Sequence, residues 1–376
     1  MRVSYINGVC VNHDAISNAI RDEVTWLLSV PGNEVRLFAY ACDFQELPVK
    51  VVSGLKDVVF DTFFQQSDIV IFHFGVFYPL FNILPVVPKT AKTIVVFHNI
   101  TPKEYLPVSA HETIDKSFQQ MSNIAFATHV VCVSQINQEV LSSNGINVPS
   151  TVLPLALRGG RELPKRKPSF DDGVSRILFV GRLVKSKGPC DLLTALSIVL
   201  AERYDIFLEV DFVGNLKFSD PDVLDYVRSA SEELLARFGG RLVINLHGDA
   251  TELVKNNLLA RADIFVLPTR HEGFCVPILE AFENGCCVLA YDNSNVPYIS
   301  GGFAKLVPTG DVTSLAREVS ATLDLNRSAE WIKQGGYANY CSDLSDYCKQ
   351  FDPKEVSKRF LHLVDDVSRQ SRISYA

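Results

Sequence analysis

The sequence lacks the features that mark several common classes of protein. Its nine cysteines form no Cys-x-x-Cys motif and no cluster with histidines, which argues against a zinc site or a disulfide framework and favours free thiols in a reducing compartment. It has no basic stripe or arm, and its formal net charge is −7, so nucleic acid is not an expected partner. The turn after the first expected strand contains no Gly-x-Gly-x-x-Gly, which argues against a Rossmann-type dehydrogenase.

Signals for export or for crossing a membrane are also missing. The apolar core of residues 1–8 is too short for a signal peptide. Residues 69–88 carry no formal charge, but the three prolines among them make a continuous spanning helix costly. We expect a buried strand at 69–74 and then an aromatic loop at 75–81, which is either domain core or a surface that faces lipid or acceptor. The expected location is the cytoplasm, and peripheral association with the inner face of the membrane stays open.

The sequence does contain a regular alternation of strand-like and helix-like segments. With 376 residues, two or three domains are expected, and the apolar content of 47% is ordinary for an α/β protein. Alternating strands and helices predict parallel sheets with helices on both faces. The expected strands are 3–7, 34–40, 68–74, 92–98 and 129–134, then 176–181, 207–214, 241–248, 262–268 and 286–292.

The most informative stretch is His271–Ala281, which reads His-Glu-Gly-Phe-Cys-Val-Pro-Ile-Leu-Glu-Ala. Pro277 suits the first position of a helix, and the apolar residues after it predict a buried helical face that stops near Gly285. Glu280 is then expected in the first helical turn and Glu272 on the loop before it. Since backbone N–H groups at a helix start can bind an anion, two acids at this place fit a phosphate that carries hydroxyl-rich sugars.

A second candidate site lies about ninety residues earlier. Arg182 and Lys187 flank a loop between the expected strand 176–181 and a helix that should begin at Pro189. Open α/β sheets bind ligands at the carboxyl ends of their strands. The forked donors of arginine and the mobile charge of lysine suit a pyrophosphate there. For either residue alone, a solvated basic loop is the alternative.

Together the two motifs resemble those of retaining glycosyltransferases with the two-Rossmann-domain (GT-B) architecture, specifically the large family 4 group, with its E-x7-E signature and its Gly-Arg-x4-Lys-Gly loop. The resemblance implies that Glu272 lies beside the transferred sugar and that Glu280 binds the ribose of the nucleotide. It also implies that Arg182 and Lys187 hold the diphosphate. The other residues expected around the donor are Gly273, Phe274, Cys275, Val276, Gly8 and Gly248.

The same resemblance implies two Rossmann-like domains that face each other across a cleft. We expect an acceptor-side domain at 1–160, a domain for the nucleotide sugar at 161–352, and a C-terminal helix within 353–376 that returns to the first domain. Residues 158–168 are basic and rich in Gly and Pro, which predicts a linker, although their charge could also attract acidic lipid headgroups.

The first domain should contribute His98, which ends an expected strand. Many members of the resembled family carry a histidine there, close to the transferred sugar, whereas a histidine at a strand end is otherwise more often structural. His73, at another strand end, is a weaker competitor. Two features depart from the family pattern: the turn after the first strand has the single glycine Gly8, and residues 285–298 lack the usual Gly-x-Pro-Val and Gly-Gly-x-x-Glu segments.

The resemblance implies a retaining glycosyltransferase of surface-polysaccharide biosynthesis, and we expect it to be independent of metal ions. Its donor would be a nucleotide-diphosphate sugar and its acceptor a glycan or a lipid-linked acceptor. No cofactor is expected, because the two cationic side chains could take the place of a metal ion at the diphosphate. The alternatives are a nucleotide-sugar epimerase or phosphorylase on the same fold, or a non-catalytic sugar-binding descendant.

Overall fold

The computed structural model describes residues 1–12, 14–157, 167 and 169–370. They pack into two compact units, which are described separately. The first unit comprises 1–103, 108–156 and the segment from 351 onward, and the second comprises 104–107 and 157–350. The expected linker at 158–168 lies outside the described residues except for Lys167.

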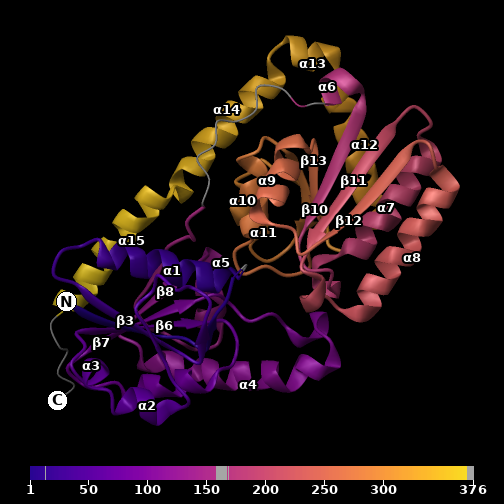
Figure 1. The fold of residues 1–376 in the computed structure, drawn as a ribbon. Helices are drawn as coiled ribbons and strands as arrows, with labels where there is room; N and C mark the ends of the chain where they lie inside the picture. Colours follow the sequence, from indigo (N-terminus) through magenta and orange to yellow (C-terminus); the bar gives the residue numbers. More distant parts are fainter. Residues whose placement is uncertain (13, 158–166, 168, 371–376) are drawn as a thin grey trace. The chain divides into compact units, whose positions relative to one another are not determined.

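A seven-stranded parallel sheet forms the centre of the first unit, in the order β5-β3-β1-β6-β7-β8-β9 (Figure 1). The order runs in opposite directions from β1 and β6, so the carboxyl ends of these two strands lie at the point where such sheets bind ligands. The strands are β1 (Arg2–Ile6), β3 (Glu34–Ala39), β5 (Val49–Val51), β6 (Ile69–Phe74), β7 (Lys92–Phe97), β8 (His129–Cys132) and β9 (Ser150–Val152), with β2 (Val9–Cys10) and β4 (Ala41–Cys42) paired separately.

Helices cover this sheet, and the last helix of the chain is one of them. Asp14 caps the first helix by accepting a hydrogen bond from the Ser17 N–H at 2.8 Å. The rings of Trp26 and Phe360 lie 6.0 Å apart and join that helix to the C-terminal one, which confirms that the latter belongs with the first domain. The helices are α1 (Ala15–Leu28), α2 (Leu55–Val59), α3 (Thr62–Gln65), α4 (His111–Met121), α5 (Gln135–Ser143) and α15 (Pro353–Arg369), with short 3₁₀ turns η1 (Pro79–Val86), η2 (Lys103–Tyr105), η3 (Val108–Ala110) and η4 (Ser122–Phe126).

The uncharged stretch at 69–88 lies partly in this core, although Val76 and Val86 within it are exposed. Its first six residues form the fully buried strand β6, as the sequence predicts. The aromatic loop then leads into η1, where Leu80, Phe81 and Ile83 are completely buried. Within the described part of the chain, no helix combines the length and the apolar character needed to cross a bilayer.

The second unit is built on a six-stranded parallel sheet in the order β12-β11-β10-β13-β14-β15, which changes direction between β10 and β13. Helices α9, α10 and α11 cover one face, and α7, α8 and α12 cover the other (Figure 1). The strands are β10 (Val174–Val180), β11 (Phe207–Gly214), β12 (Leu242–Gly248), β13 (Ile264–Leu267), β14 (Cys287–Asp292) and β15 (Lys305–Pro308). The helices are α6 (Ser169–Asp172), α7 (Pro189–Glu202), α8 (Pro221–Phe238), α9 (Glu252–Arg261), α10 (Val276–Phe282), α11 (Val296–Ser300), α12 (Val312–Arg327), α13 (Ala329–Lys333) and α14 (Gly336–Cys348), with turns η5 (Lys185–Lys187), η6 (Leu216–Phe218) and η7 (Lys349–Phe351).

The predicted fold class, α/β with two Rossmann-like domains, is therefore confirmed, with corrections at the ends of elements. Helix α10 begins at Val276, so Pro277 is its second residue rather than its first. Glu280 is the fifth residue and lies in the second turn, not in the first. The helix also ends at Phe282, before the predicted stop near Gly285. The short strands β2, β4, β5, β9 and β15, of two to four residues each, were not predicted.

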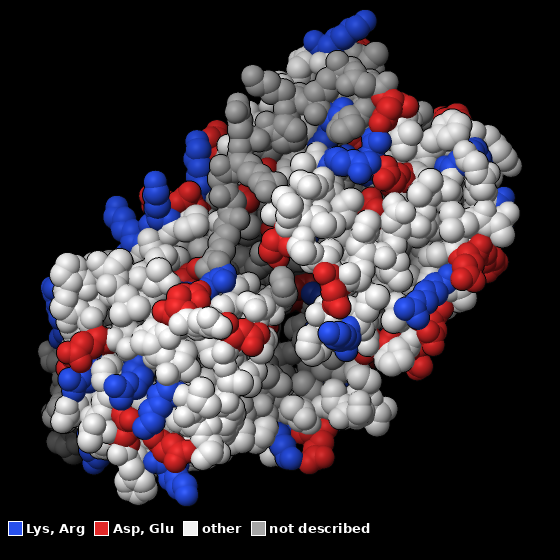
Figure 2. Space-filling model, in the orientation of Figure 1, with Lys and Arg blue, Asp and Glu red and all other residues white. Residues whose placement is uncertain are grey.

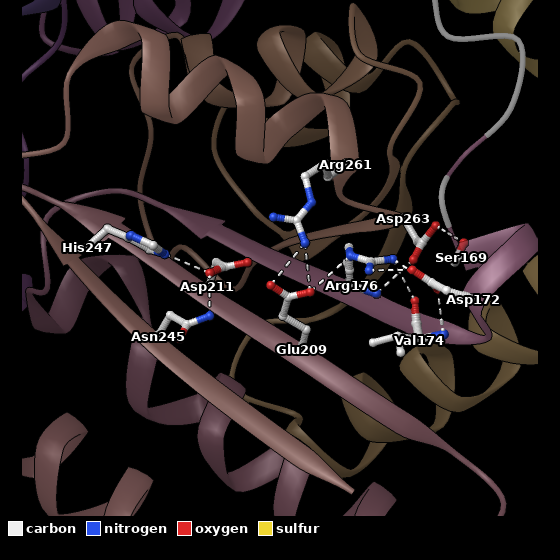
Figure 3. Close-up of polar contacts among 10 residues, drawn as sticks. All are labelled: Ser169, Asp172, Val174, Arg176, Glu209, Asp211, Asn245, His247, Arg261 and Asp263. Atoms are coloured by element: carbon white, nitrogen blue, oxygen red, sulfur yellow. Dashed lines mark hydrogen bonds and ion pairs between the residues drawn. The ribbon is translucent and has the colours of Figure 1, made fainter.

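Charged side chains at the amino-terminal edge of the second sheet form a closed network (Figure 3). Arg176 binds Asp172 at 2.6 Å and Glu209 at 3.0 Å, and Glu209 also takes a hydrogen bond from Arg261 at 3.0 Å. Asp263 accepts the Arg176 backbone N–H at 2.7 Å. Each of these charges therefore has a partner within the protein.

Candidate functional site

The Arg182–Lys187 loop lies at the carboxyl end of β10, where a glycine holds it against the loop that follows β13. Gly188 has a φ of +68°, and a Cβ on it would lie 2.2 Å from the carbonyl oxygen of Pro268. Only glycine fits this contact without a shift of backbone. The Ser186 carbonyl also accepts the backbone N–H of Arg270 at 2.7 Å. The two loops that carry the two sequence motifs are thus fixed to each other.

The two motifs meet in one ion pair. Lys187 Nζ lies 2.5 Å from Glu272 Oε1, although the residues are 85 positions apart in the sequence. The side chains retain 20% and 8% of their exposure, so the pair is largely removed from water. The Glu272 backbone N–H donates to Ser294 Oγ at 2.9 Å, which holds the loop from the other side.

Arg182 and the start of α10 have hydrogen-bond donors that no described residue accepts. The Arg182 side chain is exposed and makes no hydrogen bond or ion pair with a described residue. Within the same limits, the backbone N–H groups of Cys275 and Val276 have no acceptor. A phosphate placed here would meet a forked cation and free N–H donors.

Cys275 introduces strain at the start of α10. Its φ is +80°, a left-handed conformation that costs a residue other than glycine about 1–3 kcal/mol and is found mainly at functional sites. Burial, and after it the charge of Glu272, raise the pKa of its thiol well above the ordinary value, so the thiol stays protonated. Asn295 Nδ2 donates to the Phe274 carbonyl at 2.7 Å and helps to fix the turn, at whose centre lies Gly273.

Glu280 has a partner that the sequence did not reveal. Lys255, from α9, donates to Glu280 Oε1 at 2.8 Å and also lies 3.0 Å from Glu252. Burial lowers the pKa of Lys255, but the charges and hydrogen bonds of these two glutamates outweigh it and the net shift is upward. Glu280 is therefore held in a fixed position. Gly248 ends β12, the edge strand of the sheet, and a Cβ on it would come 2.6 Å from Leu216 Cδ1.

In the first unit, His98 and His73 are partners rather than competitors. His98 follows β7, and its Nε2 lies 2.9 Å from His73 Nδ1. His73 Nε2 lies 2.9 Å from Glu23 Oε2. The sequence gives no sign of this contact, because Glu23 is on α1, fifty residues away. Gly8 follows β1 and packs against Tyr78, where a Cβ would lie 3.2 Å from the tyrosine Cβ.

Comparisons with known proteins agree with this geometry. Residues 174–324 match the family model described as Glycosyl transferases group 1. This match lies within the second unit. Both motifs, from Arg182 to Lys187 and from Glu272 to Glu280, lie inside the matched region. The predicted resemblance to GT-B glycosyltransferases is confirmed.

One curated relative is the MMP alpha-(1->4)-mannosyltransferase of Mycolicibacterium hassiacum. It is 27% identical over 156 residues, which are 41% of this chain and 35% of that protein, so the match spans about a third of the relative.

Solved structures of the same fold cover the whole chain. An alpha,alpha-trehalose-phosphate synthase (UDP-forming) from Burkholderia xenovorans, in complex with glucose-6-phosphate, is 11% identical with a TM-score of 0.68, covering 98% of this chain and 100% of that one. Anabaena HepE in complex with UDP is 15% identical with a TM-score of 0.69, covering 97% and 100%. At these identities the likeness establishes the fold.

Proposed function

We propose that this protein is a retaining, metal-independent glycosyltransferase that moves a sugar from a nucleotide-diphosphate donor to a glycan or lipid-linked acceptor, in the assembly of a surface polysaccharide. The observation that carries the proposal is the Lys187–Glu272 ion pair at the carboxyl edge of the second sheet, with Arg182 on the same loop and without a partner among the described residues. An ion pair of a lysine and a glutamate, with an exposed arginine on the same loop, suits a ligand that has both phosphates and hydroxyl groups.

The diphosphate would bind Arg182 and Lys187, together with the N–H groups of Cys275 and Val276, which have no acceptor among the described residues. Hydrogen bonds to charged groups contribute about 1.5–3 kcal/mol each. When the phosphate takes over Lys187, the Glu272 carboxylate becomes available to the hydroxyl groups of the sugar. Glu280, held by Lys255, would accept the hydroxyl groups of the ribose.

Retention follows if the acceptor attacks on the same face from which the phosphate departs. The bond between the anomeric carbon and the phosphate oxygen breaks, a bond to the acceptor oxygen forms, and the departing phosphate takes the acceptor proton. Arg182 and Lys187 would stabilise the charge that grows on the leaving diphosphate, the kind of interaction whose loss typically costs about 10²–10³ in rate. This route needs no nucleophile from the protein.

Two findings set the order in which donors should be tested. The relative from Mycolicibacterium hassiacum is a mannosyltransferase, and HepE binds UDP. Nucleotide-linked mannose and sugars carried on UDP are therefore the first donors to try. A donor at 100 times its Kd should stabilise the protein by about 2.7 kcal/mol, which a thermal-shift screen detects.

The decisive experiment incubates the best donor with and without acceptor glycans and separates the products. Free nucleotide diphosphate together with a new α- or β-glycoside that keeps the anomeric configuration of the donor supports the proposal. Interconversion of the nucleotide sugar without an acceptor would indicate an epimerase, and a sugar phosphate formed with inorganic phosphate would indicate a phosphorylase. Binding without any turnover would leave a sugar-binding descendant.

Metal independence requires its own test, because the triplet Asp220-Pro221-Asp222 contains two carboxylates, which are ligands that Mg²⁺ and Mn²⁺ prefer. Asp220 immediately precedes α8, and its carboxylate lies 3.4 Å from the Lys185 backbone N–H, so the triplet borders the candidate phosphate loop. We expect the same transfer rate in EDTA as without it. A loss of activity that Mg²⁺ or Mn²⁺ restores would contradict metal independence.

A further inference from the structure

Four side chains of the first unit form a continuous line of hydrogen bonds that ends at His98. The Tyr5 hydroxyl donates to Glu23 Oε2 at 3.1 Å, and the same oxygen lies 2.9 Å from His73 Nε2. His73 Nδ1 lies 2.9 Å from His98 Nε2. The exposed fractions of Glu23 and His73 are only 7% and 1%, so this line of hydrogen bonds is buried within the first unit.

The donors and acceptors of this line can be assigned from the Glu23 end. A carboxylate only accepts hydrogen bonds, so His73 must donate to Glu23 from Nε2. In neutral His73 the other nitrogen, Nδ1, then carries no proton and accepts from His98 Nε2–H. Since neutral His98 has its single proton on Nε2, its Nδ1 presents a lone pair.

No described residue donates a hydrogen bond to that lone pair. His98 Nδ1 makes no hydrogen bond with any described residue, and this nitrogen is not fully buried. Burial, and after it the neighbouring His73, lower the pKa of His98 well below its ordinary value, so the ring stays neutral at pH 7. A neutral ring with a bare nitrogen is a hydrogen-bond acceptor.

The backbone around His98 is also constrained. Asn99 has a φ of +72°, a left-handed conformation that is costly for a residue other than glycine, and its Nδ2 is enclosed without a partner among the described residues. A Cβ on Gly75 would lie 3.2 Å from His98 Cβ, so the backbone of Gly75 packs closely against His98. Asn137 Nδ2 donates to the Phe97 carbonyl at 3.0 Å and fixes the end of β7. The ring of His98 is thus held in one place.

We propose that Tyr5, Glu23 and His73 are positioning residues that hold His98 as its Nε2–H tautomer, so that Nδ1 accepts a hydrogen bond from a hydroxyl group of the sugar substrate. The identity of the ligand as a sugar rests on the proposed function, whereas the tautomer does not. A bare nitrogen binds a hydroxyl that donates. It therefore disfavours substrate analogues in which that hydroxyl is replaced by fluorine or a methyl ether, since neither can donate.

The tautomer can be measured directly by NMR on protein labelled with ¹⁵N in its eight histidines. Long-range ¹H–¹⁵N spectra distinguish a ring protonated on Nε2 from one protonated on Nδ1, and the signals of His98 are those that vanish in His98→Asn. We expect His98 to be protonated on Nε2 at pH 7.5. Protonation on Nδ1, or on both nitrogens, would overturn the proposal.

Variants of Glu23 and Ser4 separate positioning from general stability. Glu23→Gln keeps the shape of the side chain but can donate as well as accept, so we expect a mixture of tautomers at His98. Ser4→Ala is the matched control, because Ser4 is next to Tyr5 on β1 and shares a buried 2.8 Å hydrogen bond with Ser67, outside the line to His98. Ser4→Ala should leave the His98 tautomer unchanged. An unchanged tautomer in Glu23→Gln would overturn the role of Glu23.

Two substitutions of His98 test which nitrogen the substrate meets. Asparagine places an amide oxygen close to the position of Nδ1, whereas glutamine reaches the position of Nε2. With an active donor and acceptor, kcat/KM should fall at least tenfold further in His98→Gln than in His98→Asn. Equal losses, or the reverse order, would contradict binding at Nδ1. If the wild-type protein transfers no sugar at all, the proposed function fails, while the NMR spectra still decide the tautomer.

Discussion

The two edges of the second sheet both carry clusters of charged side chains, but they differ in how those charges are satisfied. At the amino-terminal edge, Arg176 is paired with Asp172 and Glu209 in a closed network (Figure 3). At the carboxyl edge, Lys187 is paired with Glu272, but Arg182 has no partner among the described residues. The first arrangement is complete without a ligand, whereas the second is not.

This difference separates a structural cluster from a candidate binding site. On the outer surface, acidic and basic side chains are interspersed on the face shown in Figure 2, so charge alone does not single out a site there. Hydrogen-bond donors without partners do indicate a site, because a bound anion can accept their hydrogen bonds. Substitutions at the carboxyl edge should therefore change binding and turnover, and substitutions at the amino-terminal edge should change stability.

The largest effect is expected for Lys187→Ala. This substitution removes a cation from the proposed diphosphate site, so transfer measured at saturating donor should fall at least tenfold, and by up to about 10²–10³. Lys185→Ala is the control, because Lys185 is in the same turn η5 but is exposed. It should retain near-normal turnover. Near-normal turnover in Lys187→Ala would refute the assignment of Lys187.

At the opposite edge, Arg176→Met should lower the free energy of unfolding by about 1–3 kcal/mol, because the hydrogen bonds of the guanidinium to Asp172 and Glu209 are lost. The KM for the donor should stay unchanged. Arg261→Met is the milder comparison, since the Arg261 side chain is 46% exposed and exposed ion pairs contribute about 0.2–1 kcal/mol. Urea unfolding and donor titration of both variants test the distinction, and a raised KM in Arg176→Met would break it.

Glu280→Gln should have a smaller effect on binding. The amide still accepts hydrogen bonds from ribose hydroxyls, but it loses the charge that pairs with Lys255, so the KM for the donor should rise about two- to tenfold with kcat little changed. Steady-state kinetics with the nucleotide sugar measure this split. A fall in kcat with an unchanged KM would place Glu280 at the reacting atoms instead of at the nucleotide.

The smallest expected effect concerns pH. Burial lowers the pKa of His271, with Glu272 opposing it, and Nε2 of this histidine is enclosed without a partner among the described residues. The unfolded chain therefore takes up a proton near pH 6.5 that the folded protein takes up only at lower pH, so stability falls as pH drops below about 6.5. His271→Gln should flatten this decline in melting temperatures measured from pH 7.5 to pH 5. An equal decline in both proteins would contradict it.

Much of the fold could be predicted from the sequence because the long strands and the helices that begin at proline carry strong local patterns. Helix α7 begins at Pro189 as predicted, and β11 spans Phe207–Gly214 as predicted. The start of α10 was misplaced by one residue because Cys275, a residue that rarely adopts positive φ, takes the left-handed position before it. Local preference there is overridden by the packing of the turn.

The candidate site was only partly visible for a different reason. Arg182, Lys187, Glu272 and Glu280 stand in motifs of fixed spacing, which a single sequence displays. The partners Lys255 and Glu23 do not, because each reaches its contact from another helix through the fold. Ser294 and Asn295 lie in a segment that departs from the family pattern, and only the structure shows that they hold the loop of Glu272 and Phe274.

The account depends most on the claim that the carboxyl edge of the second sheet binds the diphosphate of a nucleotide. Isothermal titration of UDP and GDP into the wild-type protein, Lys187→Ala and Lys185→Ala tests this without needing the sugar or the acceptor. We predict that one nucleotide binds the wild-type protein and Lys185→Ala alike, and that it binds Lys187→Ala at least tenfold more weakly. Equal affinity for all three proteins would contradict the account.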